Sequence, residues 1–272
     1  MSKAVFFDID GTLINIKNGQ TSMHEAVRAA IRDLRRAGCY TFIASGRPWA
    51  YLSPDFTSSG LFDGFVLLNG AIVLLYGRVI FRRDLPLPTV KEIVAIAEAN
   101  GIEYILESWP DVYLKTEYRG LEKVYRDIDI PVDRFVRDYE LDRLSVGKME
   151  FLCGTPGAGG IFHKFLAWPG LTGLIDPTLQ RYMELYSAEV SKATGIQQAL
   201  SYLNIPVEQS YAFGDGLNDL EMMDAVGHSL VMGNAGRELK ARAEHVLPTV
   251  DEDGAAEGIY RYILKRQGFS CR

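Results

Sequence analysis

The sequence has few cysteines and no apolar stretch long enough to cross a membrane. Its three cysteines are odd in number and lie far apart, at Cys39, Cys153 and Cys271. This spacing argues against a disulfide framework or a zinc site, and it favours a reducing compartment. The most apolar window, residues 64–77, is interrupted by Asn69 and Gly70 and is too short to span a bilayer. Because the N-terminus lacks a basic start followed by an apolar core, we expect no signal peptide and a cytoplasmic protein.

A basic run is also missing. The chain holds 29 Lys and Arg against 35 Asp and Glu, a formal net charge of −6, so it lacks the positive footprint of a nucleic-acid-binding protein. An acidic protein that binds an anion must concentrate its positive charge locally or take it from a metal ion. The 272 residues contain no internal repeat or low-complexity tract and suffice for one large or two modest domains. We therefore expect neither a nucleic acid nor a membrane as a partner.

The stretch that organises the rest of the chain is residues 3–14. Four apolar residues, 4–7, lead into a polar turn that contains Asp8, Asp10, Gly11 and Thr12. A short continuous apolar run predicts a buried strand covered on both faces, and side chains two apart on a strand share a face. Gly11 permits a sharp turn, and Thr12 adds a hydroxyl. Two converging carboxylates here are costly unless a cation or a reaction uses them; the alternative is an ordinary turn with acidic caps.

A strand–helix–strand unit follows from the next part of the sequence. Residues 23–37 have apolar side chains at helical spacing, and residues 39–44 form a second apolar run that ends in Ser45-Gly46-Arg47-Pro48. Such a unit is right-handed with parallel strands, and its functional groups gather at the carboxyl ends of the strands. Pro48 suits the first turn of a helix, so we expect Ser45 to precede a helix N-terminus, where an anion is favoured. Taken alone, Ser45 would be an ordinary helix cap.

The middle of the chain follows a different pattern. Residues 85–88, Leu-Pro-Leu-Pro, indicate a stiff linker, and a helix followed by strand-like segments indicates an inserted α+β module. Alternation of strands and helices resumes near Glu184. We therefore predict a discontinuous catalytic core of residues 1–83 and 184–272, and a cap domain of residues 84–183. The expected fold is α/β, a doubly wound, Rossmann-like parallel sheet with an inserted α+β cap domain.

A second acidic turn repeats the design of the first. The predicted strand at 209–213 ends in Gly214-Asp215-Gly216-Leu217-Asn218-Asp219. Four carboxylates would then cluster and repel one another unless a cation joins them: Asp8, Asp10, Asp215 and Asp219. A site of oxygen ligands without histidine or cysteine suits Mg²⁺. Lys192, at the start of a predicted helix, is poorly placed for the helix dipole. It would supply positive charge opposite the acids, and the alternative is a solvated surface lysine.

These stretches, taken together, resemble a known family. Four of them are similar to the ordered motifs of the haloacid dehalogenase-like hydrolase superfamily: Asp8-Ile9-Asp10-Gly11-Thr12, Ser45, Lys192 and Gly214-Asp215-Gly216-Leu217-Asn218-Asp219. The insertion and four further stretches resemble its Cof-like branch with a type-IIB cap: Ala44-Ser45-Gly46-Arg47-Pro48, Asn69-Gly70-Ala71, Val231-Met232-Gly233-Asn234-Ala235 and Asp251-Glu252-Asp253-Gly254. Ala193 departs from the branch, which often has glycine after the lysine. The resemblance implies a Mg²⁺-dependent phosphatase of small phosphate monoesters, often sugar phosphates.

The resemblance also implies residue roles. Asp8 would attack phosphorus and form an aspartyl-phosphate, and Asp10 would protonate the leaving alcohol and then activate water. Mg²⁺ would be held by Asp8, by the backbone carbonyl of Asp10 and by Asp215, with Asn218 or Asp219 nearby, directly or through water. The substrate phosphate would contact the remaining motif residues: Thr12, Ser45, Gly46, Arg47, Lys192 and Asn218.

Other readings remain open at this point. A phosphomutase would use the same residues, and a requirement for a sugar bisphosphate would reveal it. A catalytically silent ligand-binding regulator would show no turnover on any phosphate ester, although the intact acidic motifs weigh against it. A halide-releasing dehalogenase would need neither Asp10 nor a metal. The cap offers four candidate residues for substrate selection: Trp109, Lys115, Tyr118 and Arg181.

Overall fold

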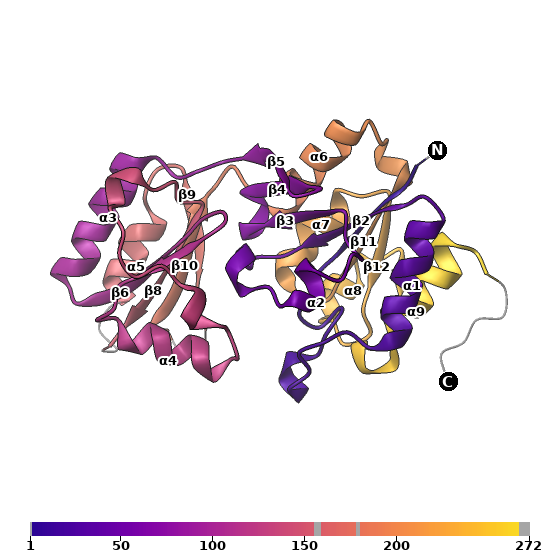
Figure 1. Cartoon of the computed structure of the whole chain (residues 1–272), viewed down its shortest axis with the longest axis horizontal. Helices are drawn as coiled ribbons and strands as arrows, with labels where there is room; N and C mark the ends of the chain where they lie inside the picture. The colour runs from indigo at the N-terminus through magenta and orange to yellow at the C-terminus, as the bar shows by residue number, and fades with distance from the viewer. Residues whose placement is uncertain (1, 155–158, 178–179, 267–272) are drawn as a thin grey trace. The chain divides into compact units, whose positions relative to one another are not determined.

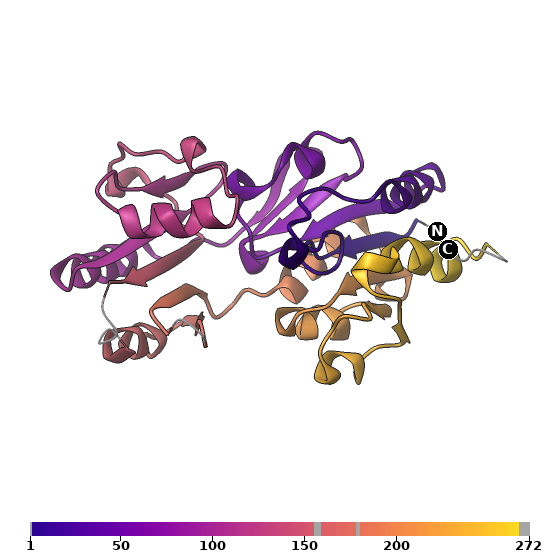
Figure 2. The same cartoon turned by 90° about the horizontal axis from the view of Figure 1, so that it is seen from below.

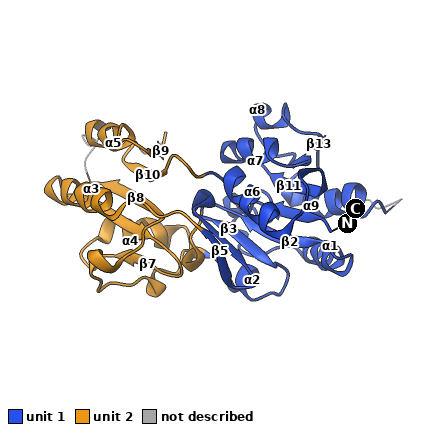
Figure 3. Ribbon diagram, turned by 90° about the horizontal axis from the view of Figure 1, so that it is seen from above, with its two compact units in different colours: residues 1–46, 52–81, 191–272 blue, residues 47–51, 82–190 orange. Residues whose placement is uncertain are grey.

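The computed structural model describes residues 2–154, 159–177 and 180–266 (Figure 1); Cys271 lies outside these ranges. The described residues form two compact units (Figure 3). The first contains the chain up to Gly46, residues 52–81 and the chain from Ser191 onward. The second contains residues 47–51 and 82–190. Within the described ranges, no helix combines the length and apolar character needed to span a bilayer.

The first unit is built on an eight-stranded sheet with the strand order β13-β12-β11-β1-β2-β3-β4-β5. The strands are β1 (Ala4–Phe7), β2 (Tyr40–Ala44), β3 (Gly64–Leu67), β4 (Ile72–Leu75), β5 (Arg78–Arg82), β11 (Ser210–Gly214), β12 (His228–Val231) and β13 (His245–Val246). The six strands from β13 to β3 run parallel, and β4 returns antiparallel to β3. Figure 2 shows β1 beside the C-terminal part of the chain, as the pairing of β1 with β11 requires. The predicted parallel α/β core is confirmed.

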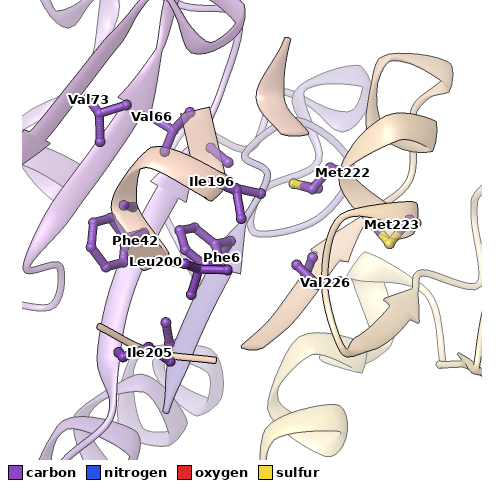
Figure 4. Close-up of a cluster of buried hydrophobic side chains, with 14 of the residues drawn as sticks. Phe6, Phe42, Val66, Val73, Ile196, Leu200, Ile205, Met222, Met223 and Val226 are labelled. Carbon is purple, nitrogen blue, oxygen red and sulfur yellow. The ribbon is translucent and has the colours of Figure 1, made fainter. Parts of the chain in front are cut away.

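Helices cover both faces of this sheet. They are α1 (Glu25–Arg36), α2 (Pro54–Thr57), α6 (Lys192–Leu203), α7 (Leu220–Asp224), α8 (Arg237–Lys240) and α9 (Gly254–Gly258), which continues as a π-helix over Ile259–Ile263. On one face, Phe6 stacks on Phe42 at 4.9 Å between ring centroids, under side chains of α6 and α7 such as Ile196 (Figure 4). On the other face of the sheet, α9 packs closely against β11, and a Cβ at Gly258 would lie 2.7 Å from the Phe213 ring. This two-sided cover explains the unbroken apolar run of β1.

One local expectation, a helix that begins after Ser45-Gly46-Arg47, is only partly confirmed. The helix expected after Pro48 is a 3-10 helix of only three residues, Trp49–Tyr51, which belong to the second unit. There they pack against aromatic side chains, Trp49 on Trp109 at 5.0 Å and Tyr51 on Tyr125 at 5.3 Å between ring centroids. Ser45 therefore precedes a single 3-10 turn, which is too short to offer an anion the N-terminus of a full α-helix.

The second unit contains a five-stranded antiparallel sheet with the order β7-β6-β8-β10-β9. Its strands are β6 (Ile102–Glu107), β7 (Val112–Leu114), β8 (Lys148–Cys153), β9 (Leu171–Ile175) and β10 (Tyr182–Ser187), and its helices are α3 (Leu87–Ala99), α4 (Arg119–Asp127) and α5 (Gly159–Leu166). Helices α3 and α5 share one apolar cluster with the sheet, and α4 shares another. The boundary expected after Met183 falls inside β10, which pairs with β8 and β9. The second unit therefore extends to Val190.

Candidate active site

The acidic and hydroxyl residues of the first unit lie at one edge of its sheet. Strand β1 pairs in parallel with β2 on one side and β11 on the other, so that Phe7 lies opposite Ile43 and Phe213. Asp8 follows β1 directly, and its backbone N–H donates to the carbonyl of Phe213 at 2.9 Å. Asp8 and Ser45 therefore leave adjacent strands at the same edge, and Asp215 leaves the third. This is the convergence that the parallel pattern predicts.

Lys192 is the positive centre of this edge. Lys192 is only 2% exposed, and its Nζ donates to Asp8 Oδ1 at 2.6 Å and to Asp219 Oδ1 at 2.7 Å. Ser191 caps α6: its Oγ accepts from the N–H of Thr194 at 3.3 Å, which fixes where the helix starts. The reading of Lys192 as a solvated surface lysine is wrong. Two carboxylates outweigh the unfavourable helix dipole at this position.

Asp219 organises the turn after β11. Its Oδ1 accepts from Lys192, and its Oδ2 accepts from the backbone N–H groups of Asp215 and Gly216, both at 3.0 Å. Both oxygens of this fully buried carboxylate are therefore in use. Asn218 is exposed beside it, and a Cβ at Gly216 would lie 2.5 Å from its Oδ1. The turn holds Asp219 inward and leaves Asn218 facing solvent.

The carboxylates of this edge fit a divalent cation. In the described chain, Asp8, Asp215 and Asp219 each place an oxygen within 4.8 Å of the others. Burial raises the pKa of Asp8 to about 8, against the opposing effect of Lys192. Burial and the nearby Asp219 charge raise the pKa of Asp215 to about 6. The single buried ammonium of Lys192 does not balance the negative charge of the three carboxylates. Carboxylate oxygens are the ligands that a hard divalent cation prefers.

The turn after Asp8 is shaped by Gly11 and Thr12. Gly11 has φ +85°, and a Cβ there would lie 2.1 Å from Asp215 Oδ2, so only glycine lets the two acidic turns approach. The N–H of Thr12 donates to the carbonyl of Ile9 at 3.3 Å. Its buried hydroxyl has no hydrogen-bond partner among the described residues. A buried polar atom left in this way is available to a ligand. Asp10, which precedes Gly11, is half-buried and forms an isolated β-bridge with Ile14.

A strained turn at residues 68–70, for which no site role was predicted, connects Ser45 with the start of α6. The N–H of Asn69 donates to the carbonyl of Ser45 at 3.3 Å, and a Cβ at Gly46 would lie 2.8 Å from Asn69 Oδ1. A Cβ at Gly70 would lie 2.0 Å from the carbonyl oxygen of Ser191. Leu68 and Asn69 adopt positive φ, 53° and 54°, a costly conformation that persists where surroundings enforce it. The available signal was the stretch Asn69-Gly70-Ala71, which supported the family resemblance but pointed to no role in the site.

The remaining predicted residues belong to the second unit, which includes Arg47. Lys115 pairs there with Glu98 at 2.6 Å, and its Nζ lies 5.8 Å from the centroid of the Tyr118 ring. Trp109 packs against Trp49, as described above. Asp8, Ser45, Lys192, Asp215 and Asp219 thus come together in the first unit, whereas Arg47 and the four cap candidates are placed with the second.

Comparison with known proteins agrees with this geometry. The family model for haloacid dehalogenase-like hydrolases matches residues 5–259. The putative phosphatase YkrA of Bacillus subtilis is 31% identical over 268 residues, covering 95% of this chain and 96% of that protein. The 5-amino-6-(5-phospho-D-ribitylamino)uracil phosphatase YitU of the same organism is 28% identical, with 95% and 96% coverage.

Solved structures show the same fold. The sugar phosphatase BT4131, of subclass IIB of the haloacid dehalogenase superfamily, matches with a TM-score of 0.79 and 25% identity over 96% of this chain and 98% of that one. A protein from Geobacillus kaustophilus matches with a TM-score of 0.84 and 26% identity, over 96% and 98%. The chain belongs to the haloacid dehalogenase-like hydrolase family, and its relatives mark it as a phosphatase, a phosphoric monoester hydrolase, of that family.

Proposed function

We propose that the chain is a Mg²⁺-dependent phosphatase that hydrolyses small phosphate monoesters, such as sugar phosphates, through an aspartyl-phosphate on Asp8. The observation that carries this proposal is the buried Lys192 ammonium, 2.6 Å from Asp8 and 2.7 Å from Asp219, beside Asp215. The relatives support it, since one is named for a phosphorylated ribityl compound and another is described as a sugar phosphatase.

Asp8 is the proposed nucleophile. One of its carboxylate oxygens forms a bond to phosphorus while the bond from phosphorus to the ester oxygen breaks. Asp10 gives its proton to that leaving oxygen and then takes a proton from the water that cleaves the aspartyl-phosphate. Lys192 keeps Asp8 oriented and offsets part of the negative charge that gathers at the reacting group. The reaction returns the free carboxylate of Asp8, an alcohol and inorganic phosphate.

The proposed metal site uses the carboxylates of Asp8 and Asp215 and the backbone carbonyl of Asp10. When bound, Mg²⁺ would offset repulsion between the Asp8 carboxylate and the phosphate dianion. Both oxygens of Asp219 already accept hydrogen bonds, so we propose that Asp219 supports the turn. Asn218 would contact the metal ion, either directly or through a water molecule.

The proposed phosphate contacts are Thr12, Ser45, Gly46 and Lys192, joined by Arg47 and Asn218. The unpartnered buried hydroxyl of Thr12 supports this assignment. These groups would recognise the phosphoryl group alone, so discrimination among esters must come from elsewhere. We propose that the second unit is a cap domain that sets this choice, and that the protein acts in the cytoplasm, where such metabolites occur.

The test is a phosphate-release assay on an aryl phosphate and a panel of phosphorylated metabolites, after exhaustive chelation and after addition of Mg²⁺. We expect turnover only with the metal, and none from Asp8→Asn. Full activity after chelation would remove the metal from the proposal. A requirement for a sugar bisphosphate would identify a mutase, and absence of turnover on every ester would point to a binding protein.

A further inference from the structure

Asn234 joins three separate segments at the edge of the acidic cluster. It lies in the loop after β12, and its Nδ2 donates to the carbonyl oxygen of Gly11 at 2.8 Å and to Asp215 Oδ2 at 3.0 Å. Its Oδ1 accepts from the backbone N–H of Val250 at 2.9 Å. One side chain thus ties the first acidic turn, the second acidic turn and the segment after β13 together.

Only an amide can make this set of bonds. Gly11 and Asp215 both present acceptors, and Val250 presents a donor, so the orientation of the Asn234 amide is fixed by its partners. An aspartate at this position has no donor when ionised and would place a third negative oxygen against the other two. A serine has one O–H for two acceptors. The position therefore requires two donors and one acceptor on a short side chain.

The two acceptors need such a bridge because they are forced together. Gly11 adopts a left-handed backbone conformation, and Asp215 Oδ2 lies only 2.1 Å from the position that a Cβ of residue 11 would occupy. A carbonyl oxygen and a carboxylate oxygen then face the same space, and they repel unless a donor lies between them. The NH₂ group of Asn234 provides that donor and fixes the rotation of the Asp215 carboxylate.

Asn234 is itself held by a rigid loop. The N–H of Met232 donates to the carbonyl of Gly214 at 3.0 Å, and the N–H of Gly233 donates to the carbonyl of Pro248 at 3.1 Å. A Cβ at Gly233 would lie 2.8 Å from the carbonyl oxygen of Leu247, so this loop and the segment after β13 are in close contact. The backbone on both sides of this contact is therefore anchored to the sheet, and it holds the exposed Asn234 side chain in place.

We propose that Asn234 is a positioning residue that fixes the Asp215 carboxylate for a divalent cation. It holds Oδ2, while Oδ1 of Asp215 accepts no hydrogen bond from the described residues. This inference rests on the proposed function, in which Asp215 is a metal ligand. Groups that orient metal ligands typically contribute about 10–100-fold to metal affinity. We expect a value near the lower end because Asn234 is exposed on its outer side.

Calorimetric titration of the metal-free full chain with MgCl₂ tests the proposal. Asn234→Ala should raise the Kd for Mg²⁺ about tenfold, and Asn234→Ser, which retains one O–H, should give a smaller rise. The matched control is Asn18→Ala, since the Asn18 side chain is also exposed but, among the described residues, donates only to the carboxylate of Asp251, at 3.3 to 3.4 Å. Its Kd should equal that of the wild type.

The melting temperature of each metal-free variant separates positioning from simple stability. A lower melting temperature for Asn234→Ala with an unchanged Kd would overturn the proposal and leave Asn234 a purely structural residue. If Asn234→Ala does not fold, the same comparison is made with Asn234→Ser, for which an unchanged Kd has the same meaning. A wild-type protein that binds no Mg²⁺ would overturn both the metal assignment and this inference, whereas an unaffected variant overturns the inference alone.

Discussion

Lys192 Nζ lies 2.6 Å from Asp8 Oδ1, and both side chains are at least nine-tenths buried. The two residues are 184 positions apart in the sequence, and they meet because β1 and α6 belong to one packed unit. The proposed nucleophile and its only contacting cation in the described chain therefore form a buried pair, which costs little while complete and much when one partner is removed.

Lys192→Met should destabilise the protein and abolish turnover. It leaves the buried carboxylates of Asp8 and Asp219 without their cation, and breaking a buried pair costs about 3–5 kcal/mol. Urea unfolding monitored by circular dichroism measures the loss. The control is Lys123→Met, whose partner Asp127 and own side chain are both largely exposed, and which should unfold like the wild type. Equal unfolding of both variants would contradict the buried-pair interpretation.

The metal-free protein should lose stability as the pH rises. The pKa of Asp8 is raised by burial from 3.8 to about 8 in the folded state. Between these values the folded protein holds a proton that the unfolded chain has lost, so the free energy of unfolding falls from about pH 4 to about pH 8. Urea unfolding in chelator across this range measures the slope. Asp8→Asn should reduce this slope most between about pH 6 and pH 8, because the raised pKa of Asp215 adds to it below about pH 6. An unaltered slope in that variant would assign the effect to other groups.

Asp10→Asn should damage alkyl phosphate turnover more than aryl phosphate turnover. An alkoxide needs a proton to leave, whereas a nitrophenolate needs much less help, and general acid–base catalysis contributes about 10²–10⁴-fold. The same variant should accumulate the aspartyl-phosphate, because water has lost its base. Mass spectrometry of acid-quenched reactions locates the phosphate. Phosphate on Asp10, or on no aspartate in the active wild type, would overturn the roles proposed for Asp8 and Asp10.

Gly11→Ala should weaken Mg²⁺ binding and turnover about 10–100-fold. The added methyl group would overlap Asp215 Oδ2 and displace a proposed metal ligand. Gly19→Ala is a matched control, since Gly19 also has a positive φ, +74° against +85°, but its Cβ would meet nothing within 4 Å. Both variants carry the same backbone strain, so only the difference between them reports on Asp215. Equal Mg²⁺ affinities would contradict the proposed role of that carboxylate.

Replacement of residues 82–190 by a short linker should reduce discrimination among phosphate esters and spare some turnover of small ones. Because Tyr51 packs on Tyr125 and Phe135 of the removed unit, the replacement also needs Tyr51→Ser to avoid a newly exposed apolar side chain. The ratio of kcat/KM values across a metabolite panel measures discrimination. An unchanged profile would show that the second unit does not select the substrate.

The sequence by itself determined the sheet and the residues at its edge. The apolar run that ends at Asp8 indicates a strand buried on both faces. Because the carboxyl ends of parallel strands lie at one edge of a sheet, Asp8, Ser45 and Asp215 are expected to lie together there, whatever the packing of the helices. Both inferences depend on periodicity and chain direction, which are local properties that can be read from neighbouring residues.

The tertiary structure alone decided how these residues are supported. Lys192 could have been a surface lysine, and only the packing of α6 against β1 buries it between Asp8 and Asp219. Tertiary packing also decided the roles of Asn69 and Asn234. It decided the boundary between the units as well, because β10 belongs to the second unit, which extends to Val190. These are contacts between residues distant in the chain. Their register and side-chain directions are set by how whole elements pack, and no local pattern records that.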